Sequence, residues 1–404
     1  MKVLRHGYVT APVLGALWMI IVATTVSVAM SFATGAAFRP SVIGALLLGA
    51  LLGVAALHLQ SLRTTPALGV VATGVLLAMG VGPAVTGIGV SFLSLALTAL
   101  AIGIGFGWPL ARFVQDMPTG HLTRHEFEGA LIQFLMATGY IVFTAIVVIP
   151  FYVMVMTSLK NQAELIQNPL DFSIDLSQGW GLFRSYIELI RDFRFGEYLW
   201  TSFYISVLTV LITLAFAIPG AYAVARLRFR GRALFSRSIL LIYMVPMIVL
   251  ALPIYIAFSM TGLRNSIAGI VMIYPVTTIP VALYMLQGYF RGLPAEIEEA
   301  GLMDGLTRLQ VIWKITMPLS LPALASVSLY VFMIAWNEFL LAFMLLDDPS
   351  KFTLTRGIAS LNSSEIPRQH LMAGSVIATL PIMAIFLGLE RFMTKGLTAG
   401  SVKG

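Results

Sequence analysis

Long apolar runs separated by short polar segments dominate the pattern of this chain. Ten of them approach the length of about 20 residues that a helix needs to cross a bilayer. Because lipid offers the backbone no hydrogen-bond partner, each run is expected to be helical. The pattern therefore predicts an all-α polytopic membrane protein with about ten transmembrane helices. The runs cover approximately residues 11–33, 41–60, 66–81, 88–111, 134–158, 198–225, 238–261, 267–289, 321–346 and 371–390.

The composition agrees with this class of protein. Of the 404 residues, 58% are hydrophobic and only 11% are charged, whereas a soluble domain carries about a quarter charged residues. The chain has no cysteine, so no disulfide framework is expected. The first apolar run is too long for a cleaved signal peptide and is followed by nine more.

The positive charges predict how the chain is oriented. Residues 226–237 hold five arginines in twelve positions, which places this segment in the cytoplasm by the positive-inside rule. The loops 160–197 and 347–370 then face outward. The net charge of +7 follows from this topology and does not require nucleic acid as a partner. Counting spans from the arginine segment also places these parts in the cytoplasm: the N-terminus, the linker 116–133, the loop 293–320 and the C-terminus.

The distribution of acidic residues divides the chain. Residues 1–115 contain no Asp or Glu and four of the apolar runs, which predicts an N-terminal membrane extension of four helices. A cytoplasmic linker, residues 116–133, follows. Residues 134–404 hold the other six runs and are expected to carry the function.

The polar segment 293–320, which we call the elbow, is expected to form two short helices. Pro294 suits a helix start because its φ is already fixed. Gly305 can take the left-handed conformation that ends a helix. Thr307 and Gln310 are spaced as a capping box that opens a second helix. A capped, amphipathic segment between two spans indicates a docking element for another protein.

The elbow also resembles the EAA loop of ABC-transporter permeases. That pattern is Glu-Ala-Ala, three residues, Gly, nine residues, and Ile-x-Leu-Pro. Gly301 stands in place of the second alanine and Met317 in place of the leucine. Flanking segments such as AYAVARLRFRGR and WNEFLLAFML are similar to those of carbohydrate (maltose-type) importer permeases, over about two thirds of the chain. The elbow meets the pattern with Glu299-Ala300-Gly301, Gly305 and Ile315-Thr316-Met317-Pro318.

The resemblance implies a six-helix type I ABC importer permease core, residues 134–404, after the four-helix bundle. It implies a multi-pass protein of the bacterial inner membrane that imports a sugar. The implied partners are an ATPase dimer, a second permease subunit and an extracytoplasmic solute-binding protein. The chain has no Gly-Lys dipeptide and hence no Walker A loop. No cofactor is therefore expected on this chain, and ATP and Mg are expected on the ATPase.

Within the family the EAA loop seats in a groove of the ATPase, which suggests roles for eight residues. Glu299 is the expected polar anchor, and Ala300 and Gly301 leave room for close approach. Asp304-Gly305 ends the first short helix, and Gly305 sets the angle between the two. The side chains expected to fill the groove are those of Leu302, Leu309 and Trp313.

A second group of polar residues lies inside the run 321–346. Trp336, Asn337 and Glu338 could line a substrate path with Tyr330, where polar groups bind sugar hydroxyls and an aromatic ring stacks on the sugar. Alternatively, Asn337 and Glu338 hydrogen-bond a neighbouring helix in the subunit interior. The sequence leaves both interpretations open.

Three alternatives to a sugar permease stay open on the sequence. The first is an importer permease for peptides or other non-sugar solutes, although the motifs that accompany the elbow favour sugars. An ion-coupled carrier needs ionisable groups at membrane depth, and only Glu338 lies well inside an apolar run. An enzyme is disfavoured because no catalytic cluster is visible. A metal site is not expected either, because His121 and His125 have no third ligand nearby.

Overall fold

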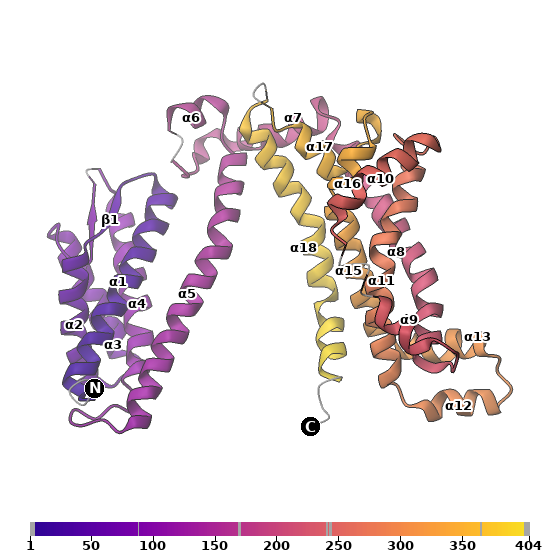
Figure 1. The fold of residues 1–404 in the computed structure, drawn as a ribbon. Helices are drawn as coiled ribbons and strands as arrows, with labels where there is room; N and C mark the ends of the chain where they lie inside the picture. Colours follow the sequence, from indigo (N-terminus) through magenta and orange to yellow (C-terminus); the bar gives the residue numbers. More distant parts are fainter. Residues whose placement is uncertain are drawn as a thin grey trace. The chain divides into compact units, whose positions relative to one another are not determined.

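A computed structural model describes residues 5–87, 89–168, 171–239, 241, 245–363 and 366–399, with the backbone alone at residue 176 and residues 391–399. The chain forms two compact units, Met1–Leu182 and Phe183–Gly404, which we call unit 1 and unit 2. Almost all of the described secondary structure is helical (Figure 1). The all-α prediction is therefore confirmed, with one short two-stranded ribbon as an addition.

Unit 1 consists of two helical hairpins followed by a long helix. The ribbon joins the two hairpins: β1 pairs antiparallel with β2, and Arg39 lies opposite Val85. Each hairpin consists of a helix, one strand of the ribbon and a second helix. The elements are α1 (Gly7–Thr34), β1 (Phe38–Pro40), α2 (Val42–Leu59), α3 (Thr64–Ala78), β2 (Ala84–Thr86), α4 (Phe92–Phe113), α5 (Arg124–Ser158) and α6 (Gln162–Gln167), with a 3-10 helix, η1 (Leu176–Phe183), at the junction with unit 2.

Glycines let the helices of each hairpin approach closely. A Cβ atom added to Gly15 in α1 would lie 2.3 Å from the carbonyl oxygen of Gly49 in α2. A Cβ atom on Gly103 in α4 would lie 2.4 Å from the backbone of Val70 in α3. Small residues serve this purpose widely in membrane helices, where packing rather than hydrophobicity holds helices together.

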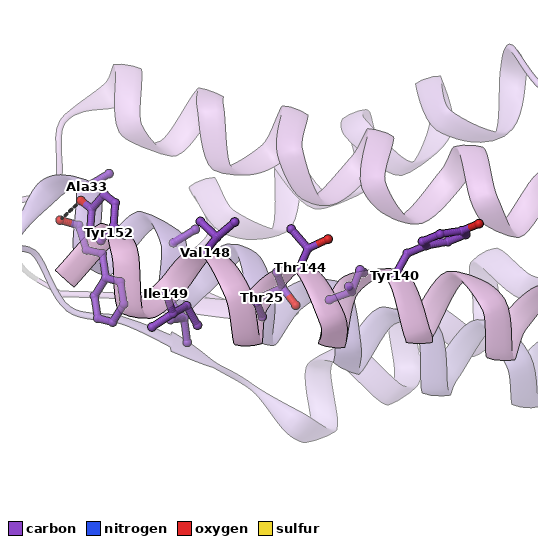
Figure 2. A pocket seen from close by; sticks show the side chains of 12 residues that line it. Thr25, Ala33, Tyr140, Thr144, Val148, Ile149 and Tyr152 are labelled. Carbon is purple, nitrogen blue, oxygen red and sulfur yellow. Dashed lines mark hydrogen bonds between the residues drawn. The ribbon is translucent and has the colours of Figure 1, made fainter. Parts of the chain in front are cut away.

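Helix α5 belongs to unit 1 by its contacts. A capping box between Thr123 and Glu126 fixes its start, and Ala130 and Phe134 join the buried core of the bundle. An apolar groove of about 420 Å³ separates its second half from α1 (Figure 2). Tyr152 anchors that half, since its ring stacks on Phe32 in α1. The predicted boundary instead assigns residues 134–158 to the permease core, and it stays a prediction.

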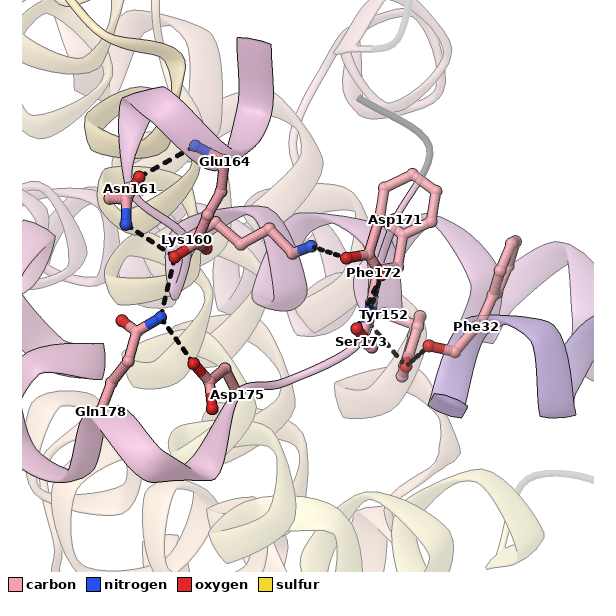
Figure 3. A network of polar contacts seen from close by, with 10 residues as sticks. All are labelled: Phe32, Tyr152, Lys160, Asn161, Glu164, Asp171, Phe172, Ser173, Asp175 and Gln178. Carbon is pink, nitrogen blue, oxygen red and sulfur yellow. Dashed lines mark hydrogen bonds and ion pairs between the residues drawn. The ribbon is translucent and has the colours of Figure 1, made fainter. Parts of the chain in front are cut away.

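A polar network holds the segment after α5 (Figure 3). The Tyr152 hydroxyl lies 3.2 Å from the carbonyl oxygens of both Phe32 and Phe172. Lys160, which is 7% exposed, forms a 3.1 Å ion pair with Asp171. Partial burial acts to raise the pKa of Asp171, but hydrogen bonds from Ser173 and the Lys160 charge outweigh it and hold this pKa below its usual range. The carboxylate therefore stabilises the fold of this segment only while it is ionised.

Unit 2 packs α8 against α11 and α15, and α15 against α18. Two buried clusters form its core, one around Tyr274 and Trp336 and the other around Tyr222 and Phe290. Its elements are α7 (Arg184–Asp192), α8 (Phe195–Arg226), α9 (Arg232–Ser238), α10 (Met247–Met260), α11 (Ile267–Gly292), α12 (Ala295–Met303), α13 (Arg308–Val311), η3 (Ile312–Thr316), α14 (Met317–Leu319), α15 (Leu321–Asn337), α16 (Leu340–Leu345), η4 (Pro349–Lys351), α17 (Leu354–Ser360) and α18 (Arg368–Ala399).

Seven described helices are long and apolar enough to cross a membrane, namely α1, α2, α4, α5, α8, α11 and α18. An eighth span arises if the pair 308–319 and 321–337, bent by 83°, counts as one. The apolar helices α3 and α10 are shorter, with 15 and 14 residues. The structure thus supports seven to eight spans among the described residues, and the count of ten stays a prediction. The expected continuous span 321–346 is wrong, because the helix breaks after Asn337.

Candidate coupling site

The first helix of the elbow, α12, forms between the predicted Pro294 and Gly305 and has a well-defined end. Pro294 precedes it with φ −59°. At its C-terminus the Leu306 amide donates to the Gly301 carbonyl oxygen at 3.0 Å, and the Gly305 amide donates to that of Leu302 at 3.1 Å. This pair of bonds is a Schellman motif, which needs a left-handed residue. Gly305 supplies that residue, with φ +85°.

The second helix of the elbow begins with the predicted capping box. The Thr307 amide donates to the Gln310 side chain at 2.8 Å, and the Gln310 amide donates to the Thr307 hydroxyl at 3.3 Å. The helix then runs through α13, a π-helical turn (η3) and α14. The elbow lies at the end of unit 2 opposite α7 and α17 (Figure 1). Both short helices predicted from the caps are confirmed.

Most of the predicted coupling residues are exposed. Glu299, Ala300, Asp304 and Gly305 are exposed, and Leu302 is half-buried. We call the three most exposed apolar side chains of the elbow the elbow patch: Met303 (88% exposed), Leu309 (68%) and Trp313 (65%).

Two residues of the elbow, Met303 and Gly301, differ from what the sequence led us to expect. Met303 was missed, although a long apolar residue beside the polar Asp304 is a visible signal for an exposed contact. Gly301 is buried, and a Cβ atom there would lie 2.5 Å from Cδ1 of Ile315. The small size of Gly301 therefore serves the packing of α12 against η3.

Glu298 is the main residue that the sequence reasoning missed. Glu296 and Glu298 both lie in the first turn of α12, but Glu296 is exposed whereas Glu298 is only 5% exposed. Its carboxylate accepts hydrogen bonds from the Thr316 hydroxyl at 3.0 Å and the Tyr222 hydroxyl at 3.2 Å. It also forms an ion pair with Nε of Arg226 at 3.4 Å. We call these four residues the Glu298 cluster.

The cluster is energetically important because it is buried. The side chains of Arg226 and Glu298 are 14% and 7% exposed, respectively. A second nitrogen of Arg226 donates to the Leu293 carbonyl oxygen at 2.7 Å. Removing one partner of a buried ion pair leaves an uncompensated charge and typically costs about 3–5 kcal/mol. The cluster is therefore expected to hold the elbow firmly to the end of α8.

The predicted substrate-path residues have separate environments. Trp336 is buried and donates from Nε1 to the Ala378 carbonyl oxygen at 3.1 Å. Asn337 is exposed, but its side-chain amide bonds to Met333 of its own helix at 2.9 Å. Tyr330 is half-buried and packs on the cluster around Tyr222 and Phe290.

Glu338 stabilises the helix break in this region. Its carboxylate accepts from the amides of Leu341 at 2.7 Å and Ala342 at 3.1 Å. These are free amides in the first turn of α16, so Glu338 caps that helix. Contact of the four predicted path residues with a substrate stays a prediction.

Comparison with known proteins identifies the family. The profile of the family described as "Binding-protein-dependent transport system inner membrane component" matches residues 217–398. The chain is 38% identical over 269 residues to the inner membrane ABC transporter permease protein YcjP of Escherichia coli, which covers 66% of this chain and 95% of that protein. This chain belongs to that family.

Other similarities agree with the assignment. This permease is 33% identical over 282 residues to the trehalose/maltose transport system permease protein MalG of Thermococcus litoralis, covering 69% of this chain and 99% of MalG. Its fold also matches a chain in the crystal structure of a bacterial ABC transporter involved in the import of the acidic polysaccharide alginate. That match has a TM-score of 0.57 at 24% identity and covers 68% of this chain and 99% of the other.

The assignment confirms the resemblance drawn from the elbow. This chain is a multi-pass inner-membrane permease and not the catalytic component of its transport system. A binding-protein-dependent ABC permease implies an ATPase and a binding protein as partners. The family match includes the elbow and the Glu298 cluster.

Proposed function

We propose that this permease is one transmembrane half of an ATP-driven importer that takes up a mono- or oligosaccharide delivered by a solute-binding protein. The observation that carries the proposal is the elbow, a rigid, capped segment with an exposed apolar patch in a chain of this permease family. A second permease subunit completes the translocation path. ATP and Mg bind to the separate ATPase, and this chain carries no cofactor.

The elbow has the features of a surface that docks on a folded partner. The elbow patch exposes three large apolar side chains, which a groove on a soluble partner protein can bury. Exposed apolar patches with a polar rim mark interaction sites. Glu299 and Asp304 are exposed beside the patch and supply that rim. ATP-driven movement of the ATPase pair then moves the elbow and tilts the spans, which alternates access.

Three points support a sugar as the solute. MalG, a relative over most of its length, is named for trehalose and maltose. The WNEF run and the order of the other motifs resemble those of sugar permeases. Import of a non-sugar solute is the alternative, because the elbow and the family match are independent of the solute.

The proposed topology and domain plan follow the charge pattern. The elbow and the arginine segment 226–237 lie in the cytoplasm, and the long loops between α5 and α8 and after α16 face the binding protein. The outermost residues of both termini, 1–4 and 400–404, lie outside the described residues. Ten spans result if the bent pair 308–319 and 321–337 counts as one span and α3 and α10 also cross the membrane, with four spans in the N-terminal extension and six in the permease core.

Docking can be tested by replacing an elbow-patch residue. We expect Trp313→Ser to reduce the amount of ATPase that co-purifies with the permease, because the variant removes a large apolar contact. Trp200→Ser is a matched control, since Trp200 is also 65% exposed but lies in α8. Equal co-purification from the two variants would contradict docking at the elbow.

The solute can be tested with the complete transporter in liposomes. We expect the binding protein to stimulate ATP hydrolysis only when it is loaded with a sugar such as trehalose or maltose. Stimulation by amino acids or peptides, and not by any sugar, would favour the non-sugar alternative. Uptake driven by an ion gradient without ATPase would contradict both.

A further inference from the structure

We propose that Glu298 is a positioning residue that makes the elbow and the end of α8 move as one body, so that movement of the ATPase reaches the spans. The inference rests on the proposed function, because it concerns how the docked elbow transmits motion. It assigns Glu298 a role different from that of its neighbour Glu299.

Several segments of the chain meet at the carboxylate of Glu298, and this geometry supports the proposal. Glu298 lies in α12, and Thr316 lies at the end of η3 in the second elbow helix. Tyr222 and Arg226 come from the last turns of α8. Arg226 also binds the carbonyl oxygen of Leu293, the residue that follows α11. Both helices of the elbow and two spans are thereby joined through four polar contacts.

Burial makes this connection stiff. Thr316 is 0% exposed and Tyr222 is 2% exposed, so water has little access to their hydroxyl groups. Charged hydrogen-bonding groups interact more strongly in such a setting than at the surface. Displacing α12 relative to α8 would break several of these contacts together. The elbow therefore cannot rotate freely while α8 stays in place.

Helix α8 is suited to pass the motion on. It packs against α11 and α15 along the core of unit 2. A displacement of its elbow end therefore acts on two further spans through packed side chains. An apolar contact at the same place would resist separation but allow sliding, whereas the directed bonds of the Glu298 cluster fix the register.

The adjacent glutamates then have complementary roles. Glu299 is exposed and available to the ATPase, and Glu298 is turned inward to α8. Glu296 in the same helix is exposed as well. Replacement by glutamine removes the charge while keeping the size of the side chain. The pair Glu298→Gln and Glu296→Gln therefore forms a matched test and control.

The test uses the complete transporter in lipid nanodiscs, with its ATPase, second permease subunit and binding protein. It measures bound ATPase, ATP turnover and solute molecules moved per ATP. We expect Glu298→Gln to keep the ATPase bound and ATP turnover high, but to lower solute moved per ATP by on the order of tenfold, within the usual range of coupling between sites. Glu296→Gln should match the wild type in all three measurements.

Two milder variants distinguish a loss of coupling from misfolding caused by Glu298→Gln. Tyr222→Phe and Thr316→Val each remove one hydroxyl while nearly conserving shape, and we expect each to lower solute moved per ATP by less than Glu298→Gln does. Exchange of the two charges, Glu298→Arg with Arg226→Glu, should recover part of the loss seen in Glu298→Gln. Such recovery would show that coupling requires the pair of charges rather than a carboxylate at position 298.

The outcomes separate this inference from the proposed docking site. Unchanged solute per ATP in Glu298→Gln and in both milder variants overturns the inference. Loss of the ATPase from Glu298→Gln, while Tyr222→Phe and Thr316→Val keep full transport, also overturns it, because Glu298 would then serve docking. Failure of docking itself is detected independently by Trp313→Ser.

Discussion

Two adjacent glutamates in the elbow, Glu298 and Glu299, have opposite environments. One turn of helix α12 presents Glu299 to solvent and Glu298 to Tyr222 and Thr316. A hundred degrees of rotation per residue is sufficient to separate a surface charge from a buried one. The two glutamates thus differ in what they can contact because they lie on different faces of the helix.

Another carboxylate, that of Asp171, should make the stability of the protein depend on pH. Its pKa lies below the usual value of about 3.9. A lowered folded-state pKa means that the stabilisation is present above the usual pKa and is lost as the pH falls through the folded value. We expect Asp171→Asn to lower the free energy of unfolding at pH 7 by no more than about 1 kcal/mol, the size typical of a partly exposed ion pair, and so to lower the thermal midpoint.

The same variant should lose its effect in acid. The difference in midpoint between wild type and Asp171→Asn should shrink as the pH falls below about 3.9. Asp116→Asn is the control, since Asp116 is an exposed loop carboxylate of unit 1, whereas Asp171 is partly buried. A difference that is equal at pH 7 and in acid would show that the charge of Asp171 does not contribute.

At the scale of elements, caps decide where the helices of the elbow begin and end. The Schellman motif at Gly305 and the capping box at Thr307 satisfy the free amides and carbonyls between α12 and α13. Glu338 does the same at the start of α16. Each cap is local in sequence, yet it fixes the direction of the following helix.

Gly305 offers a direct test of the elbow angle. We expect Gly305→Val to strain the left-handed position, at a cost of roughly 1–2 kcal/mol, and to lower both ATPase binding and transport. The spans should remain folded, so helicity by circular dichroism should be unchanged. Gly288→Val is the control, because Gly288 is exposed in α11 and a Cβ atom there meets nothing within 4 Å. Full transport by Gly305→Val would show that this angle is not needed for coupling.

At the scale of the whole molecule, the chain combines two compact units of different character. Unit 1 is held by glycine contacts and a buried apolar core. Unit 2 contains the elbow and all of residues 217–398, the segment that matches the family profile. Related permeases are covered almost completely by about two thirds of this chain. The remaining third is therefore an addition relative to those relatives.

This arrangement predicts the effect of a truncation. We expect a chain lacking residues 1–115 to insert, bind its ATPase and import solute as the full chain does. The deletion removes four predicted spans, an even number, so the orientation of the rest should be preserved. Accessibility of a tag at the new N-terminus measures that orientation. Loss of import by a correctly inserted truncated chain would show that the extension takes part in transport.

The sequence by itself determined the helical membrane class, the two short helices of the elbow and the family. These features depend on apolar run length and on caps formed by residues three to five positions apart, such as Thr307 with Gln310. Only the tertiary structure decided that Glu298 is buried and Met303 exposed, and that α5 packs on the N-terminal bundle. Those outcomes depend on partners far away in the chain: Tyr222 lies 76 positions from Glu298. No local pattern encodes such a contact, because it exists only after α8 and the elbow have packed together.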